Sequence, residues 1–357
     1  MKDRVPLYPG RVKLTPVSGQ ENTYDMVRAD EPTQEGTPLN KASLLSDETA
    51  AALKLPQSDP TVNDALYVLK QIMPTAVLNV TPDAGAVVTA TKGSNVLSAT
   101  ADSSGLAVLY PYKLGTWTLK VTTNGKTLEV PFVIDAIAVF NTSLTTDLEA
   151  ASWGLISVVA EAGNAASAWS VGAKKTIKLN GVSYTAQIIG FNHDTKTAGG
   201  KAGITFQLVD CLNTKYQMNS SKTNVGGWKS SSMRSSMSEF LGQLDEDLQS
   251  VIKPVNKLVS IGNKTSTIET VSDKLFLLSE VEIFGSTMYS FAGEGSQYDW
   301  YKAGNTKVKK VNGSANSWWE RSPHRGNTTA FCTVISDGDA ANNFANNSYG
   351  VSFGFCV

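Results

Sequence analysis

The chain has 357 residues, enough for two or three domains, and its 31 lysines and arginines nearly balance its 32 aspartates and glutamates. No basic stripe stands out, so the charge pattern of a nucleic-acid-binding protein is missing and we expect no nucleic acid as a partner. No apolar run approaches the roughly 20 residues of a membrane span, so we expect no membrane insertion. Residues 1–10 lack a hydrophobic signal segment, so we expect the protein to be made in a cytoplasm and either to stay there or to leave by lysis or a dedicated machine.

Residues 1–75 are expected to form an attachment and oligomerisation segment. Its first part is rich in proline and polar residues, and short strands are predicted around residues 11–17 and 23–29. This part holds too little apolar material for a core of its own. We therefore expect it to need a partner.

Two short helices are predicted later in this segment. The first lies within residues 39–55, with Asn40 or Ser46 as its N-cap, and the second spans residues 61–73 after the cap Thr61. One side of the second helix carries Val62, Leu66, Leu69 and either Ile72 or Met73. A lone helix of this length is marginal in water, so this apolar side must be covered, either by its own chain or in a trimer of this helix.

Residues 76–136 change to a period of two. Short β-branched runs alternate with the turn sequences "PDAG", "KGSN", "DSSG" and "TNGK", which is typical of an antiparallel β-sandwich. This segment resembles the carboxypeptidase-regulatory and bacterial Ig-like modules that serve as spacers on surface proteins. We expect one small Ig-like domain.

Residues 137–357 mix helices and strands, so the fold class expected for the whole chain is multidomain α+β. A helix capped by Asp147, a hairpin turning at Asn180 and Gly181, and a buried strand within residues 203–212 are predicted in turn. Two helices follow within residues 226–252, and Pro254 closes the second.

Several motifs of this part occur in a fixed order: "GGWKSSSMRSSM", "IKPVNKLV", "SDKLFLLSEVEIFG", "GEGSQYDWYKAGN", "WWERSP" and "SYGVSFGFCV". They resemble a bacterial and prophage domain of unknown function that looks like a divergent C-type-lectin-like fold, close to the formylglycine-generating-enzyme branch. The N-terminal segment is similar to the opening of tail-fibre and baseplate-attached proteins from phages of Gram-positive bacteria. Together these resemblances imply a homotrimeric receptor-binding protein of the virion. Its N-terminus would bind a baseplate or tail protein, and its C-terminal domain a glycan or protein of the host surface.

The last part of the chain is expected to alternate between core and surface. The predicted core residues are Trp318, Trp319, Phe331, Cys332, Val334, Val351, Phe353, Phe355 and Val357. The predicted outward, ligand-binding residues are His324, Gly326, Ala330, Thr333, Ile335, Asp337, Asp339, Ala341, Asn342, Asn343, Phe344, Asn346 and Asn347. This tail resembles the target of a diversity-generating retroelement, in which asparagine codons are randomised. For the asparagine run alone, simple turn chemistry remains the alternative.

The "WWERSP" motif is expected to be structural. Core packing is favoured over sugar stacking for its two tryptophans, and Glu320 and Arg321 are expected to form an ion pair or to bond backbone groups. Asp337 and Asp339 suggest a calcium loop, but the further oxygen ligands of such a loop do not follow. We expect no metal and no cofactor.

Catalysis is not expected. The histidines, His193 and His324, have no partner nearby in the sequence. Cys211, Cys332 and Cys356 fit no zinc pattern and are predicted as buried thiols, with a Cys332–Cys356 disulfide as the alternative. The chemistry of the formylglycine-generating enzymes resembles that of copper bound by a close pair of cysteines. Cys332 and Cys356 are expected on separate core strands, so this motif is not reproduced here. A bacterial surface adhesin with the same domain, and a polysaccharide depolymerase using Asp337 or Asp339, remain the alternatives.

Overall fold

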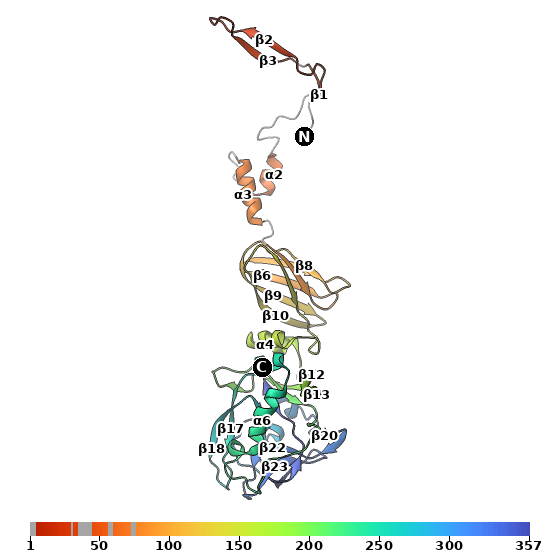
Figure 1. The fold of residues 1–357 in the computed structure, drawn as a ribbon, viewed down its shortest axis with the longest axis vertical. Helices are drawn as coiled ribbons and strands as arrows, with labels where there is room; N and C mark the ends of the chain where they lie inside the picture. The colour runs from red at the N-terminus through yellow and green to blue at the C-terminus, as the bar shows by residue number, and fades with distance from the viewer. Residues whose placement is uncertain (1–4, 30, 35–44, 56–59, 73–75) are drawn as a thin grey trace. The chain divides into compact units, whose positions relative to one another are not determined.

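The computed structural model describes residues 5–29, 31–34, 45–55, 60–72 and 76–357. Contacts divide the chain into two compact units, Met1–Thr75 and Ala76–Val357. Short helices and many strands in small sheets are mixed along it (Figure 1), which confirms the α+β class. No helix in the described ranges is both long and apolar enough to span a membrane.

The first unit begins with two hairpin-like pairs of strands. Strand β1 (Val5–Pro6) pairs with β4 (Pro32–Gln34), and β2 (Val12–Pro16) pairs with β3 (Tyr24–Arg28). Strands β2 and β3 confirm the two strands predicted in this part. Every residue of β2 and β3 is exposed. An isolated two-stranded hairpin is at best marginally stable in water, so this one carries no core of its own.

Two helices complete the first unit. Helix α2 (Asp47–Ala52) has Ser46 as its N-cap, whereas the alternative cap Asn40 lies outside the described residues. Helix α3 (Val62–Ile72) follows Thr61, whose hydroxyl accepts a hydrogen bond from the Asp64 backbone amide, as predicted. The small core of this pair consists of Leu45, Ala50, Leu55 and Ala65. On the predicted apolar side of α3, Leu66 and Leu69 are 57% and 37% exposed, so the described part of the chain does not cover them.

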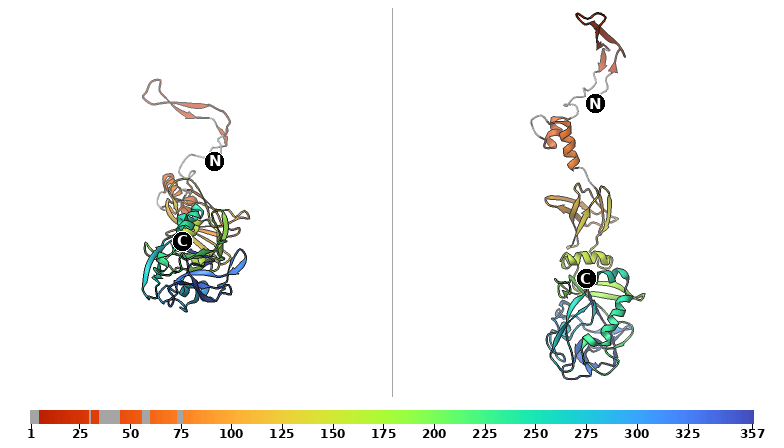
Figure 2. Two further views of the ribbon diagram at one scale, coloured as in Figure 1. Left: turned by 60° about the horizontal axis from the view of Figure 1, so that its bottom comes forward. Right: turned by 60° about the vertical axis from the view of Figure 1, so that its left-hand side comes forward.

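The second unit begins with seven strands that form two sheets (Figures 1 and 2). They are β5 (Val77–Thr81), β6 (Val87–Lys92), β7 (Asn95–Thr100), β8 (Ala107–Leu109), β9 (Gly115–Thr123), β10 (Lys126–Ile134) and β11 (Val139–Ser143). The sheet orders are β10-β9-β6-β7 and β11-β5-β8, and buried side chains of both sheets belong to one core that contains Trp117.

The predicted turn sequences lie between these strands, and Asn124 and Gly125 of the β9–β10 turn take positive φ angles of 48° and 74°. Every strand pair within residues 76–136 is antiparallel, which confirms that prediction, whereas the following strand β11 pairs with β5 in parallel. Strand β11 also lies beyond residue 136, the expected end of this domain. The expected domain boundaries themselves stay a prediction.

The C-terminal part begins with α4 (Trp153–Glu161) and α5 (Ala165–Ala168), which contact β10. The N-cap of α4 is Ser152, whose hydroxyl accepts from the Leu155 amide. The prediction of Asp147 as the cap is wrong. Its carboxylate accepts from the Glu149 amide instead and closes a separate turn before the helix.

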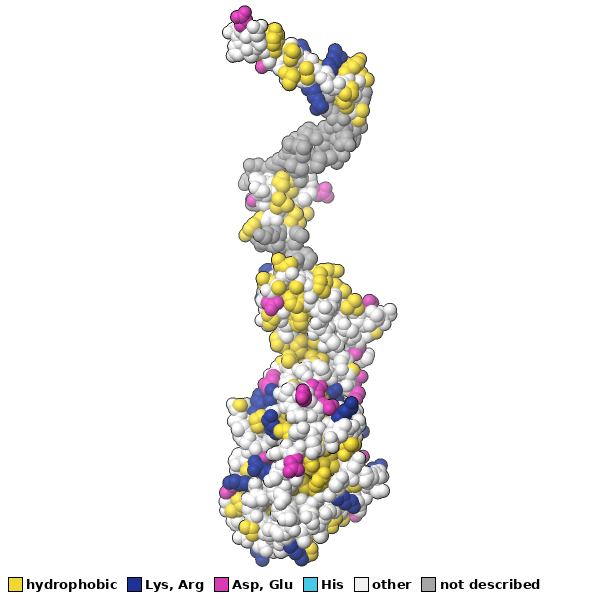
Figure 3. All heavy atoms as spheres, in the orientation of Figure 1, with side chains coloured by type: hydrophobic (Ala, Val, Ile, Leu, Met, Phe, Trp, Pro, Cys, Tyr) yellow, Lys and Arg dark blue, Asp and Glu magenta, His cyan; other side chains and the backbone are white. Residues whose placement is uncertain are grey.

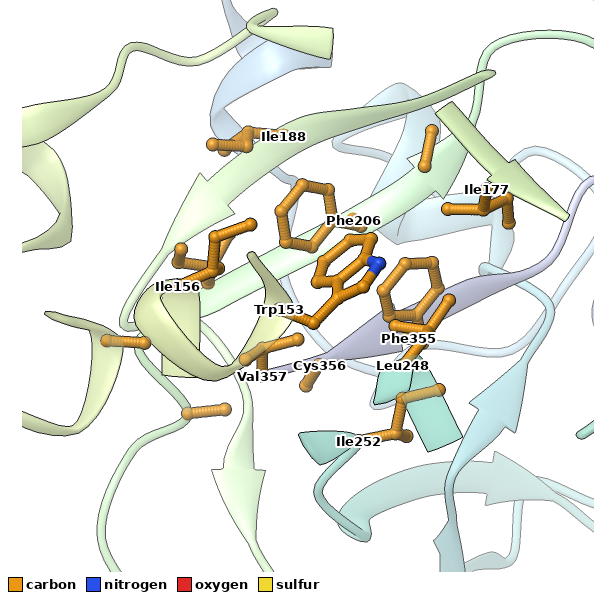
Figure 4. Packing of buried hydrophobic residues seen from close by; sticks show 14 of the residues in the cluster. Trp153, Ile156, Ile177, Ile188, Phe206, Leu248, Ile252, Phe355, Cys356 and Val357 are labelled. Carbon is orange, nitrogen blue, oxygen red and sulfur yellow. The ribbon is translucent and has the colours of Figure 1, made fainter. Parts of the chain in front are cut away.

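A five-stranded sheet forms the centre of this part, in the order β12-β13-β15-β26-β19. Its strands are β12 (Lys174–Leu179), β13 (Val182–Phe191), β15 (Ile204–Leu208), β19 (Leu275–Phe276) and β26 (Gly354–Cys356). The β12–β13 turn at Asn180 and Gly181 and the fully buried β15 confirm two predictions. Figure 4 shows Trp153 of α4 packed against Phe206 and Phe355, with ring centroids 5.4 and 5.9 Å away.

Helices and small sheets surround this centre. The helices are α6 (Ser232–Gln243), α7 (Glu246–Val251), α8 (Glu280–Phe284), α9 (Asp299–Lys302) and the 3-10 turn η1 (Trp228–Ser230). The small sheets contain β14 (Thr195–Lys196) with β17 (Val255–Ser260) and β18 (Ile268–Asp273), β16 (Tyr216–Gln217) with β25 (Ser348–Tyr349), and β20 (Lys309–Val311) with β21 (Ser314–Asn316). The last is β22 (Trp318–Pro323), β23 (Ala330–Val334) and β24 (Ala340–Phe344). All three cysteines are free and buried, as predicted.

Candidate ligand-binding surface

The predicted ligand-binding residues belong to the β22-β23-β24 sheet and its loops. Strand β23 lies in the middle, and every residue of β22 and β23 is buried. Strand β24 is the edge strand of this sheet and pairs with β23. Its first four residues are half-buried, and Phe344 at its end is exposed. The sheet therefore has a buried base and one partly exposed edge strand.

The nine residues predicted as core in this tail are at most 1% exposed, which confirms that prediction. The indole nitrogens of Trp318 and Trp319 donate to the backbone carbonyls of Lys307 and Tyr216 at 3.0 and 2.7 Å. Both tryptophans are therefore packed and bonded inside the domain, as expected for a structural role.

Two of the predicted outward residues face inward. Ala330 and Thr333 are 0% exposed, so the expectation that they lie at the surface is wrong. The reason is that β23 has a strand on either side and both its faces are covered, so alternation along it produces no exposed face. The others are half-buried or exposed: His324, Gly326, Ile335, Asp337, Asp339, Ala341, Asn342, Asn343, Phe344, Asn346 and Asn347. Their contact with a ligand stays a prediction.

The asparagine run divides into strand and turn. Asn342 and Asn343 belong to β24, whereas the Asn347 amide donates to the Phe344 carbonyl at 2.9 Å and closes a turn. The Asn347 side chain also donates to Asn343 Oδ1 at 3.0 Å. Turn chemistry therefore accounts for Asn346 and Asn347 but not for the two asparagines on the strand.

The loop between β23 and β24 is closed by local bonds. The Asp339 amide donates to Asp337 Oδ1 at 3.1 Å, and Gly338 between them has a φ of 97°. In the part of the chain that the structure describes, no group of three or more His, Cys, Asp or Glu side chains could hold a metal ion. The aspartates here shape the hairpin loop.

A distant segment adds residues to this surface that the sequence did not indicate. Lys222 Nζ lies 3.3 Å from the centroid of the Phe344 ring, which is 41% exposed, and Gln217 Nε2 donates to the Asn346 carbonyl at 2.6 Å. The segment that carries Gln217 and Lys222 therefore lies beside β24. Nothing in the spacing of these residues predicts the contact.

Asn224 holds the loop before β23 in place. It is 0% exposed, and its side-chain amide donates to the carbonyls of Asn327 and Ala330, both at 2.8 Å. Its side-chain oxygen accepts from the Asn263 amide at 3.0 Å. At Gly227 a Cβ atom would lie 1.8 Å from the Ser260 carbonyl oxygen, so the backbones pack too closely here for any side chain. The adjacent glycines of "NVGGW" were the one sequence signal of such a close approach.

Arg321 bonds this sheet to the rest of the domain. Its expected ion pair with Glu320 is wrong: the guanidinium pairs with Glu282 and donates to the carbonyls of Leu277, Leu258 and Glu294. The expected bonding to backbone groups is thus confirmed for Arg321. Burial alone would lower the pKa of Arg321, but the charge of Glu282 outweighs it and raises this pKa.

The ion pair extends into a buried network. Lys257 Nζ lies 2.7 Å from both Glu282 Oε1 and Asp194 Oδ1, and Asp194 also accepts from the Tyr298 hydroxyl at 2.8 Å. Burial would raise the pKa of Asp194, yet Lys257 holds it well below its usual value. The charges are therefore all paired, and they connect β17, α8 and β22 beneath the surface.

Glu320 lies in the same interior but outside this ion-pair network. It is 0% exposed, and neither carboxylate oxygen has a hydrogen-bond partner. Burial, and then the nearby Glu280 and Glu294, raise its pKa well above the usual value. Its neutral, protonated form is therefore favoured in the folded domain.

Three residues with the chemistry of a hydrolase triad do meet in space. His193 Nε2 lies 3.1 Å from Ser296 Oγ, but it lies equally close to the Ser296 carbonyl oxygen, and Nδ1 is 3.6 Å from Asp194 Oδ2. That last distance is longer than a hydrogen bond, and Asp194 is already held by Lys257 and Tyr298. The arrangement joins two loops. It lacks the hydrogen bond between the histidine and the aspartate that orients the imidazole in a hydrolase triad.

Residues 202–357 match the model of a family described as a domain of unknown function (DUF6273). Among curated proteins, none matches the chain. The matched region contains every predicted ligand-binding residue, together with Asn224, Arg321 and most of the buried network. This part of the chain is therefore similar to a family whose description assigns no activity.

Proposed function

We propose that the chain is a phage or prophage tail-fibre protein, carried in the virion, whose C-terminal domain binds a glycan or protein on the surface of a host bacterium. The observation that carries this proposal is the contrast within one small sheet. Strand β24 and its loops expose polar and apolar side chains, while β22 and β23 beneath them are wholly buried. Side chains on such an edge can change without loss of the core, which suits a recognition surface.

The finer fold assignments belong to this proposal. Two sheets with a shared core around Trp117 support an Ig-like spacer, and we assign the C-terminal part to a divergent C-type-lectin-like fold. The function proposed for that part is non-covalent recognition, without catalysis, metal or cofactor. A network of fully paired buried charges supports a rigid scaffold for it.

The first unit supports assembly into a homotrimer attached to a baseplate or tail protein. Directly opposite residues of β2 and β3, such as Leu14 and Met26, share a face, and these two are 55% and 70% exposed. On α3, Leu66 and Leu69 are also uncovered. Partner chains would bury these side chains, and three linked heads would bind a surface more tightly than one.

Diversification by a retroelement is part of the same proposal. Ile335 and Phe344 are apolar, yet the first is only half-buried and the second is exposed. Sequencing the DNA around the gene would test it. Tail genes, a reverse transcriptase and an adenine-rich near-copy of the last coding segment are expected. Tail genes without the copy would leave a fixed receptor-binding protein, and the absence of both would favour a bacterial adhesin.

The binding face is tested by replacing Ile335, Phe344 and Asn346 together with alanine. Attachment to cells that bind the wild-type chain should fall strongly, whereas the melting temperature should change little, because Phe344 is exposed and Ile335 and Asn346 are only half-buried. The control replaces the exposed residues Lys178, Glu239 and Lys302 of the same domain with alanine. Equal attachment of both variants would refute the proposed face, and unfolding of the first would show that these residues are core.

A further inference from the structure

A groove of about 390 Å³ lies between α6 and the strands β18 and β19, and no predicted ligand-binding residue lines it. Helix α6 lines one side with Arg234, Ser235, Met237, Ser238 and Leu241. The other side consists of Pro254, Ser272, Asp273, Lys274 and Leu275, and Lys229 also lines the groove. This volume suits a single sugar ring rather than a protein segment.

The base of the groove is apolar. Met237 and Leu275 are 3% and 2% exposed, and the half-buried Leu241 and Pro254 extend the same surface. Aliphatic and thioether groups in the lining can contact the C–H face of a pyranose ring, because that face is the apolar side of a sugar.

The rim is polar, and most of its charges are already paired. Arg234 Nε donates to Asp273 Oδ1 at 2.8 Å, and Asp273 also accepts from the Trp228 indole at 2.8 Å. Lys229 pairs with Glu269 at 2.7 Å, outside the groove.

Two features of the rim remain available to a ligand. Ser235 and Ser238 are exposed and can exchange hydrogen bonds with sugar hydroxyls. Lys274 is exposed, and within the described ranges it is the one cation of the lining without a carboxylate partner. The groove thus combines an apolar base, two hydroxyls and one uncompensated positive charge.

We propose that this groove binds an anionic pyranose, a hexuronate or a sugar phosphate, as a second site separate from the β24 surface. The ring packs on Met237 and Leu241, its hydroxyls bond Ser235 and Ser238, and its carboxylate or phosphate pairs with Lys274. The site shares no lining residue with the β24 surface. Loss of one therefore leaves the other intact, and the two proposals fail independently.

The test uses the full chain with ¹³C-labelled methionine methyl groups, followed by NMR during titration with glucuronate, glucose 6-phosphate and methyl glucoside. The Met237 methyl, assigned through Met237→Leu, should shift with at least one of the two acids. The Met233 methyl, 1% exposed on the same helix but outside the groove, should not. The neutral glycoside should bind more weakly by up to about fivefold, which is the upper range for one exposed ion pair. The acid that binds identifies whether the anion is a carboxylate or a phosphate.

Matched variants assign the site. Ser238→Trp fills the groove and should abolish the Met237 shift, whereas Glu239→Trp, exposed on the next position of α6 but outside the lining, should leave it unchanged. Lys274→Gln should weaken acid binding to the level of the neutral glycoside. The inference is overturned if no sugar shifts Met237, if neutral and acidic sugars bind wild type equally, or if Ser238→Trp binds like wild type.

Discussion

Two short strand pairs of similar length show how differently the two units are built. In β2 and β3 of the first unit every residue is exposed, whereas in β22 and β23 of the second every residue is buried. Both pairs are antiparallel, and the more exposed pair β2–β3 keeps an unbroken register, whereas β22–β23 has a register shift between Trp319 and Pro323, so strand pairing alone does not explain the difference in burial. The difference lies in whether other parts of the same unit cover the side chains. We therefore expect the second unit, but not the first, to be stable without a partner.

The interior of the C-terminal domain explains how it can be self-contained and still carry a partly exposed edge strand. Asp194, Lys257, Glu282 and Arg321 are all nearly or fully buried, and each charge has an opposite partner. Such a network is costly to break, but it depends on no residue of β24. The first unit has no comparable interior among its described residues, since its small core holds four side chains.

The strongest way to break this contrast is Arg321→Met. It leaves Glu282 and three backbone carbonyls without their main donor inside the domain. We expect the free energy of unfolding to fall by about 3–5 kcal/mol, the usual cost of removing one partner of a buried ion pair. Urea unfolding followed by tryptophan fluorescence measures this. Arg325→Met, an exposed neighbour, is the control and should cost no more than about 0.5 kcal/mol; similar values for the two would contradict the role of the network.

Asn224→Ala should have an intermediate effect. It removes the donor to the Asn327 and Ala330 carbonyls and the acceptor of the Asn263 amide. Buried polar groups left without partners cost about 1–3 kcal/mol, and the amides of residues 324–330 should exchange hydrogen faster. The control is Asn305→Ala, which breaks one bond to the Trp300 carbonyl. An unchanged exchange rate in residues 324–330 would show that Asn224 does not hold the loop.

Glu320→Gln should stabilise the C-terminal domain, because it removes a buried carboxylate whose oxygens have no hydrogen-bond partner. A gain in stability would sharpen the contrast with the first unit. The pKa of Glu320 is raised in the folded state, so the folded state binds more protons than the unfolded state between the two pKa values. Wild-type stability must then fall as pH rises through that window. Glutamine cannot ionise, so we expect the stability of the variant relative to wild type to rise with pH and to be a gain at neutral pH. Unfolding curves at several pH values measure it, and parallel pH profiles for the two proteins would exclude the effect.

Local patterns predicted much of the fold. Period-two runs and the Asn180–Gly181 turn located the hairpins, and the apolar residues of the tail located its core. The predicted helix cap was wrong because Asp147 and Ser152 are both residue types that favour an N-cap and lie a few positions apart. Ser152 caps the helix, whereas Asp147 bonds a backbone amide in the turn before it. The prediction that Ala330 and Thr333 lie at the surface was wrong because it assumed that one face of the strand meets solvent. Strand β23 lies in the middle of its sheet and every residue of it is buried.

The contacts that organise the site could not be predicted. Asn224 and Ala330 are 106 positions apart, and Arg321 and Glu282 are 39 apart, so no local spacing relates them. The Lys222–Phe344 contact is of the same kind. Residue type indicated that Arg321 would need partners, but which carboxylate it meets depends on the packing of β22 against α8.

Hydrogen–deuterium exchange of the full chain, measured at a low and a high protein concentration, tests the division between the two units most directly. The account predicts that amides of β23 and β26 are protected equally at both concentrations, because their partners lie in the same chain. Amides of β2, β3 and α3 should become protected only when the chains associate. Strong protection of β2 and β3 in the monomer would contradict the account, since it would show that the first unit is stable without partners.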